Sequence, residues 1–222
     1  VTHITADVTD EGALAAAADR IAAEAGRIDI LVCCAGFGIS GAVEFTPLAD
    51  ARRQLDVNFF GTVNAVRAVL PHMRRANGGR IVCTSSVAGA IPIPFQTYYS
   101  VSKAAVNAYV RALRCELRPF GIGVCAVMPG DIATGFTAAR EKSPAGDDVY
   151  GGRIARSVTG MEKDEKNGGT PDAAGRFLAR RALQRRVRPL YTIGLKYQVF
   201  NFIAALMPKR LLGWCIYQMY AK

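Results

Sequence analysis

The sequence of 222 residues has only two histidines, His3 and His72, and its six cysteines form no Cys-x-x-Cys pair. A zinc site needs ligands of these two kinds at close spacing, so no metal site is predicted. Cys33, Cys83 and Cys125 fall inside apolar runs, where free thiols behave as small hydrophobic side chains. These features favour a reducing compartment over a disulfide framework, and we expect a cytoplasmic protein.

Long hydrophobic runs are also absent. No uninterrupted apolar run reaches the roughly 18 residues of a membrane span, and residues 1–10 lack the basic start and apolar stretch of a secretory signal. Half of the residues are hydrophobic and 21% are charged, which is the composition of a globular protein. The length predicts a single domain. We expect a soluble chain that at most lies against a membrane surface.

Acidic residues are absent from the last fifty positions. Residues 1–172 carry 18 Lys or Arg and 18 Asp or Glu, whereas residues 173–222 carry ten basic residues and no acidic one. The net charge of +10 therefore comes from the C-terminal region alone. No recognised RNA-binding module or set of interleaved aromatic residues accompanies these arginines, so no nucleic-acid partner is predicted.

The segment 195–222 is apolar and basic, and we expect it to be helical with a break at Pro208. Aromatic and aliphatic residues beside lysines and arginines are typical of helices that lie on anionic membranes. A helix that covers a substrate cleft or a subunit interface would have a similar pattern. Both interpretations stay open at this point: peripheral membrane contact, and a helix that covers the substrate cleft or a subunit interface.

Predicted strands and helices alternate along the chain. The strands are expected at 1–6, 28–34, 80–84, 122–128 and 190–193, and the helices at 10–25, 46–76, 99–117 and 172–184. This alternation predicts an α/β fold with a doubly wound parallel sheet of Rossmann type. The uninterrupted apolar runs 28–34 and 122–128 predict strands buried on both faces.

Three further local features complete the predicted organisation. Thr46 is expected to cap the helix 46–76, with Pro47 in its first turn. The Gly-, Lys- and acid-rich segment 135–170 predicts a lid-like loop region. Ligands of parallel sheets bind beyond the carboxyl ends of the strands, so we expect a site near Gly36, Ser86 and Pro129.

Tyr99 and Lys103 stand four residues apart in a predicted helix, so their side chains share one face. An ammonium beside a phenol favours the phenolate. Lowering a tyrosine pKa from about 10 to about 7 needs roughly 4 kcal/mol, much of which a nearby cation can supply. The pair alone is common by chance. It gains weight because Ser86 follows a predicted buried strand and because the amide of Asn58 lies inside a long predicted helix.

These residues together resemble the short-chain dehydrogenase/reductase family. The resemblance extends over about residues 1–137, and its order and spacing make it specific. It comprises Asp7-Val8, Ala35-Gly36, Asn58, Ser85-Ser86, Tyr99-x-x-x-Lys103 and the run Pro129-Gly130-Asp131-Ile132-Ala133-Thr134.

The resemblance implies an oxidoreductase that transfers hydride between NAD or NADP and a small-molecule carbonyl or secondary alcohol. The catalytic residues it implies are Asn58, Ser86, Tyr99 and Lys103. The cofactor-binding residues it implies are Asp7, Val8, Ala35, Gly36, Tyr99, Lys103, Pro129, Gly130, Ile132 and Thr134. It also implies a homo-oligomer. The apolar C-terminal segment is similar to that of members that act on lipophilic substrates such as steroids, retinoids or long-chain carbonyls.

The sequence departs from the family pattern in two places. The family motif Asn-Asn-Ala-Gly is Cys33-Cys34-Ala35-Gly36 here, and no Gly-x-x-x-Gly-x-Gly turn precedes Asp7. A β-α-β unit needs roughly 30 residues. We therefore interpret residues 1–222 as a single incomplete NAD(P)-binding Rossmann domain that lacks its first β-α-β portion through N-terminal truncation, and expect these residues alone to be inactive. The alternative is a non-catalytic remnant or scaffold of the same fold.

Overall fold

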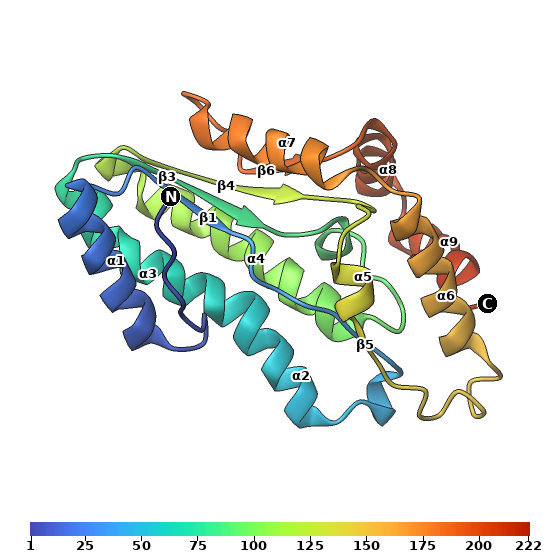
Figure 1. Cartoon of the computed structure of the whole chain (residues 1–222). Coiled ribbons are helices and arrows are strands. Elements are labelled where there is room, and N and C mark those ends of the chain that lie inside the picture. The colour runs from blue at the N-terminus through green and yellow to red at the C-terminus, as the bar shows by residue number, and fades with distance from the viewer.

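The computed structural model describes residues 1–222 and centres on a parallel four-stranded sheet (Figure 1). Its strands stand in the order β1-β3-β4-β6, with crossovers between them. The strands are β1 (Ile30–Cys33), β3 (Gly79–Thr84), β4 (Ile122–Met128) and β6 (Leu190–Thr192). A second, two-stranded parallel sheet pairs β2 (Ile39–Ser40) with β5 (Glu141–Lys142).

Helices cover both faces of the main sheet. Figure 1 shows α1 to α4 on one face and α7 on the other. Those on the first face are α1 (Glu11–Ala25), α2 (Leu48–Leu55), α3 (Gly61–Arg75) and α4 (Thr97–Glu116), and α7 spans Pro171–Leu183. The doubly wound parallel fold predicted from the sequence is therefore confirmed.

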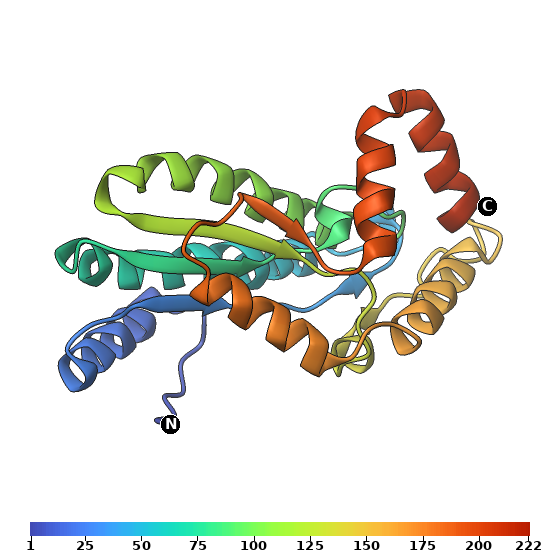
Figure 2. The ribbon, with the colours of Figure 1, turned by 90° about the horizontal axis from the view of Figure 1, so that it is seen from above.

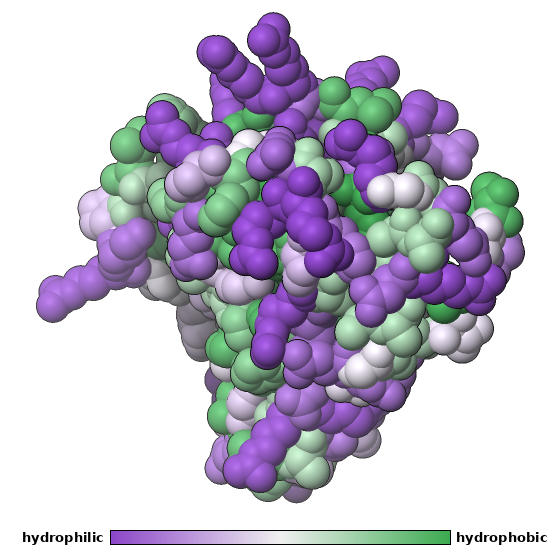
Figure 3. Space-filling model, turned by 90° about the vertical axis from the view of Figure 1, so that its left-hand side faces the viewer, coloured by the Kyte–Doolittle hydropathy of each residue, from purple (hydrophilic) through white to green (hydrophobic).

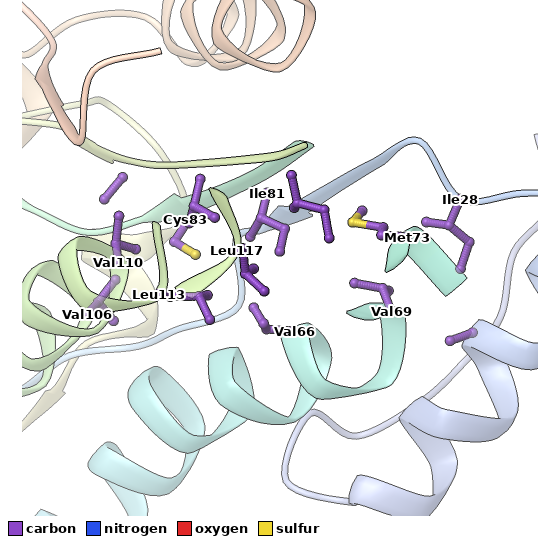
Figure 4. Packing of buried hydrophobic residues seen from close by; sticks show 14 residues of the cluster. Ile28, Val66, Val69, Met73, Ile81, Cys83, Val106, Val110, Leu113 and Leu117 are labelled. Atoms are coloured by element: carbon purple, nitrogen blue, oxygen red, sulfur yellow. The ribbon is translucent and has the colours of Figure 1, made fainter. Parts of the chain in front are cut away.

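The main core lies between the sheet and helices α3 and α4 (Figure 4). On α3, Val66, Val69 and Met73 recur at helical spacing and face the sheet. Ile81 and Cys83 of β3 point toward them and are fully buried. Each such side chain contributes about 1.5–3 kcal/mol on burial, so this core holds α4 firmly against the strands whose ends form the site.

The two apolar strands predicted to be buried on both faces differ in the structure. The prediction is correct for β4, whose central residues are buried. It is wrong for β1, because Ile30 and Val32 are 38% and 40% exposed. These two side chains are exposed because β1 is an edge strand. The helical cover on that face packs against Val82 of β3 and Cys125 of β4 and does not bury them.

Three local predictions in the N-terminal half are also wrong. Residues 1–6 form no strand. Thr46 does not cap a helix, because its hydroxyl donates to the Ala42 carbonyl at 2.8 Å and Pro47 occupies the position before α2. The expected long helix 46–76 is divided into α2, a π-helical turn over Asp56–Phe60 and α3.

The segment 135–170 is more ordered than the lid-like loop that the sequence suggests. It contains the short helix α5 (Phe136–Ala139), β5 and the helix α6 (Arg153–Lys166). Ile154, Val158 and Met161 of α6 are buried at helical spacing. That spacing is present in the sequence, but the many charged and glycine residues around it obscured it.

The C-terminal region forms two helices as expected, α8 (Leu195–Leu206) and α9 (Lys209–Tyr220), with Pro208 between them. Figure 2 shows them as a hairpin that projects from the body, with the C-terminus near α6. No helix in the structure has the length and hydrophobicity needed to cross a bilayer.

Candidate active site

A cavity of about 500 Å³ lies at the carboxyl ends of the central strands. Ser86, Tyr99 and Lys103 all line it, together with Gly36 from the loop after β1. Of its 27 lining residues, 15 are hydrophobic, so the polar groups of the site face a largely apolar space. This is where ligands of open parallel sheets bind.

Ser86 is placed where β3 leaves the sheet. Its hydroxyl accepts a hydrogen bond from the Ala88 amide at 3.1 Å and so caps the turn Val87–Gly89. The neighbouring Ser85 hydroxyl donates to the Lys103 carbonyl at 3.0 Å, which ties this strand end to α4. A Cβ on Gly89 would lie 2.7 Å from the backbone of Lys103, so only glycine permits this close packing.

The first turns of α4 carry Tyr99 and Lys103 into the cavity. The Lys103 ammonium donates to the Thr84 carbonyl at 3.0 Å and lies 5.7 Å from the centre of the Tyr99 ring. Phe136 of α5 packs against Tyr99, with 5.5 Å between ring centres. Lys103 is only 4% exposed, which is rare for lysine. Such burial indicates a role at the site that outweighs the free-energy cost of removing the ammonium from water.

The pKa values of the pair differ from the expectation that Lys103 acidifies Tyr99. Removal of the phenol from water raises the pKa of Tyr99 to about 12, although the Ser86 hydroxyl opposes this rise. Burial also lowers the pKa of Lys103 to about 8. Desolvation disfavours the charged form of both groups and is the largest cause of each shift. Tyr99 is therefore a neutral phenol at pH 7, able to donate a proton.

Asn58 lies in the π-helical turn and is fully buried. Its Oδ1 accepts from the Phe37 amide at 2.9 Å, and its Nδ2 donates to the Phe37 carbonyl at 2.9 Å and to Ser102 Oγ at 3.1 Å. Asn58 thus fastens the loop after β1 to α4. A Cβ on Gly36 would lie 3.1 Å from Asn58 Oδ1 and 3.3 Å from Lys103 Nζ, so glycine keeps the space beside the ammonium free.

The structure brings together most of the residues singled out from the sequence. Those that line the cavity are Gly36, Ser86, Tyr99, Lys103, Pro129, Gly130, Ile132 and Thr134. Asn58 stands directly behind Gly36. Cys34, which replaces an asparagine of the family motif, also lines the cavity and lies 3.4 Å from Thr84 Oγ1. The motifs therefore converge on one site.

Asp7, Val8 and Ala35 do not line this cavity. Asp7 is exposed and accepts hydrogen bonds from the amide and hydroxyl of Thr9, both at 2.8 Å. The carbonyl of Val8 accepts from Asn64 Nδ2 at 3.1 Å. Ala35 is exposed, between two residues that do line the cavity. The cofactor contacts predicted for these three residues stay predictions.

Two polar pairs at the cavity were missed by the sequence reasoning. Tyr197 of α8 donates to Asp131, and both residues line the cavity. Arg140 is buried and pairs with Glu165 of α6, whose carboxylate also accepts from Thr137 Oγ1 at 2.7 Å. The partners in each pair are far apart in the sequence, so no local motif could have indicated them.

Comparison with known proteins agrees with this geometry. The chain matches the family model described as short chain dehydrogenase over residues 1–145. It therefore belongs to the short-chain dehydrogenase family, an oxidoreductase family with a Rossmann-type fold.

Two relatives and one solved structure show how far the similarity extends. The chain is 38% identical to 3-ketodihydrosphingosine reductase of Bacteroides thetaiotaomicron over 225 residues, which cover 100% of this chain and 83% of the relative. It is 38% identical to human 17-beta-hydroxysteroid dehydrogenase type 1 over 130 residues, 59% of this chain and 39% of that protein. A short-chain dehydrogenase from Streptomyces avermitilis superposes with a TM-score of 0.80 at 25% identity, covering 97% of this chain and 78% of that one.

Proposed function

We propose that the protein is an NAD- or NADP-dependent oxidoreductase that interconverts a ketone and a secondary alcohol on a lipophilic small molecule. The observation that carries the proposal is the meeting of Ser86, Tyr99 and Lys103 in one largely apolar cavity. A phenol, a hydroxyl and an ammonium there can transfer a proton to a substrate oxygen and stabilise the charge that develops on it.

The residues at the cavity fit the nicotinamide end of such a cofactor. Lys103 has three N–H donors, of which one is used on the Thr84 carbonyl, so two are free for a ribose hydroxyl. Gly36 leaves the space beside that ammonium open. Thr134 adds a hydroxyl, and Pro129 and Gly130 bring the backbone at the end of β4 to the same wall.

When bound, the cofactor supplies or accepts the hydride at the carbonyl carbon. In reduction, the neutral Tyr99 phenol donates its proton to the carbonyl oxygen while the Ser86 hydroxyl donates a hydrogen bond to that oxygen. The Lys103 ammonium then favours the phenolate left on Tyr99. In oxidation, the same phenolate removes the alcohol proton. Asn58 acts as a positioning residue that holds the loop beside Lys103.

The proposed substrate class rests on the apolar lining and on two relatives. The name of one relative describes reduction of a 3-keto sphingoid compound, and that of the other describes a hydroxysteroid. Both are lipophilic molecules with a ketone or a secondary alcohol. We propose the same class here, in a cytoplasmic homo-oligomer whose segment 195–222 contacts a membrane peripherally.

The experiment follows the hydride itself, in the protein expressed from its complete gene. NADH and NADPH deuterated at C4 are offered with a long-chain ketone, and the alcohol is analysed by mass spectrometry. Deuterium on the carbinol carbon is expected from one of the two cofactors. Dinucleotide binding without transfer to any steroid or long-chain ketone would contradict the proposal and support the non-catalytic alternative.

A further inference from the structure

We infer that the α8–α9 hairpin docks on an anionic membrane surface and that lipophilic substrate reaches the cavity from the bilayer past α8. The substrate route rests on the proposed function. The docking surface rests only on the residues of the hairpin. It assigns two roles to the two faces of one helix.

The inner face of the hairpin forms part of the cavity wall. Tyr197 and Phe200 of α8 and Tyr220 of α9 line the cavity. The Tyr197 ring lies directly against Gly130, because a Cβ there would be 2.2 Å from a ring carbon. Asn201 Nδ2 donates to Thr192 Oγ1 at 3.0 Å and fastens α8 to β6. Helix α8 and the end of α9 therefore form one wall of the site.

The outer face carries large apolar side chains in water. On α8 they recur at steps of three or four residues, as one stripe along the helix. The exposed members on the two helices are Leu195, Val199, Phe202, Ile203, Leu206, Leu211, Trp214, Tyr217 and Met219. Phe202 is 66% and Leu206 72% exposed. Large apolar side chains gathered in this number on two adjacent helices mark a candidate interaction site.

Charge identifies a lipid surface as the occupant. The hairpin carries Lys196, Lys209, Arg210 and Lys222 and no acidic residue, and α7 and its following loop add further arginines. The first three lie at or near helix ends and are exposed. A basic, aromatic and aliphatic face without carboxylates is complementary to anionic headgroups above an acyl layer.

The opposite end of the molecule differs from the hairpin. Figure 3 shows the face at the amino ends of the strands, where hydrophilic side chains are interspersed with small hydrophobic areas. The apolar stripe lies instead at the end of the molecule that contains the cavity. An α-helix with its side chains is about 10 Å across, so a lipid against the outer face of α8 is one helix away from Tyr197 and Phe200.

The docking test uses Trp214, the single tryptophan of the chain, which lies on α9 and is 59% exposed. Vesicles of phosphatidylglycerol and phosphatidylcholine with brominated acyl chains should shift its emission to the blue and quench it. Vesicles of phosphatidylcholine alone should bind more weakly, and salt should weaken the anionic binding. The double variant Phe202→Glu, Leu206→Glu should bind the anionic vesicles at least about tenfold more weakly than the wild type. The control variant Leu48→Glu, on α2, should bind them as the wild type does.

Unchanged Trp214 emission on every vesicle would overturn the docking. A blue shift that grows with protein concentration in the absence of lipid would also overturn it, because a second copy of the chain would then be the occupant. Both readouts are independent of catalysis, so they remain informative if the proposed function fails.

The access route is tested by comparing two ketones in the complete protein. A long-chain ketone held in anionic vesicles should be reduced at least about tenfold more slowly by the double variant than by the wild type, by the same loss of apolar contact. A short water-soluble ketone should be reduced equally by both. Equal rates on the vesicle-held ketone would overturn the route. Failure to reduce either ketone, with Trp214 still quenched, would refute the oxidoreductase proposal and leave membrane docking as the role of the hairpin.

Discussion

Replacing the buried lysine of the site should stabilise the protein at neutral pH. Burial lowers the pKa of Lys103 from 10.5 to about 8, which corresponds to about 3 kcal/mol of unfavourable free energy for holding the charged form. Lys103→Met removes that cost but leaves the Thr84 carbonyl without its hydrogen bond, a loss of about 1 kcal/mol. We expect the free energy of unfolding to rise by about 2 kcal/mol at pH 7, with loss of activity.

The pH dependence provides the sharper test. The unfolded chain holds the Lys103 proton up to about pH 10.5 and the folded chain releases it above about pH 8, so wild-type stability rises in this window. By pH 9.5 the wild type should regain about 2 kcal/mol, which removes the advantage of Lys103→Met. Urea unfolding at pH 7 and 9.5 measures both values, and Lys163→Met at an exposed position is the control. An advantage that stays the same at both pH values would refute this reasoning.

Two further substitutions test the packing around the site. Arg140→Gln should cost about 3 kcal/mol of stability, because it leaves Glu165 without its buried partner. The double variant Arg140→Gln, Glu165→Gln should recover most of this loss when stability is measured by thermal unfolding. No recovery would contradict the pairing. Gly89→Ala should lower both stability, by about 1–3 kcal/mol, and turnover, because its Cβ meets the Lys103 backbone. Gly175→Ala, which meets nothing within 4 Å on α7, should raise stability slightly instead, and equal effects at the two glycines would count against the close contact.

The order of the elements and the place of the site could be predicted because both depend on local pattern. Apolar runs identified β1, β3 and β4, and parallel strands bring their ends to one edge of the sheet. The position of Ser86 could be predicted from the end of β3 at that edge, and that of Tyr99 from its helical spacing to Lys103. The exposure of Ile30 and Val32 could not be predicted in this way, because it depends on where α7 packs, which is against β3 and β4 rather than the edge strand β1.

The electrostatics of the site could not be predicted from spacing alone. The sequence places an ammonium near the Tyr99 phenol but does not show how much water surrounds either group. In the structure, desolvation dominates and moves both pKa values toward the neutral forms. The Arg140–Glu165 pair could not be predicted from the sequence either, because its partners come together only when α6 packs beside α5.

The role of the Tyr99 phenol as the proton donor to substrate is tested most directly by Tyr99→Phe in the complete protein. The substitution removes one hydroxyl and keeps the ring against Phe136. We expect turnover of a ketone at saturating cofactor to fall at least about a hundredfold, while the dissociation constant for NAD(P)H, measured by calorimetry, changes by no more than about twofold (about 0.4 kcal/mol). Undiminished turnover in Tyr99→Phe would contradict the mechanism.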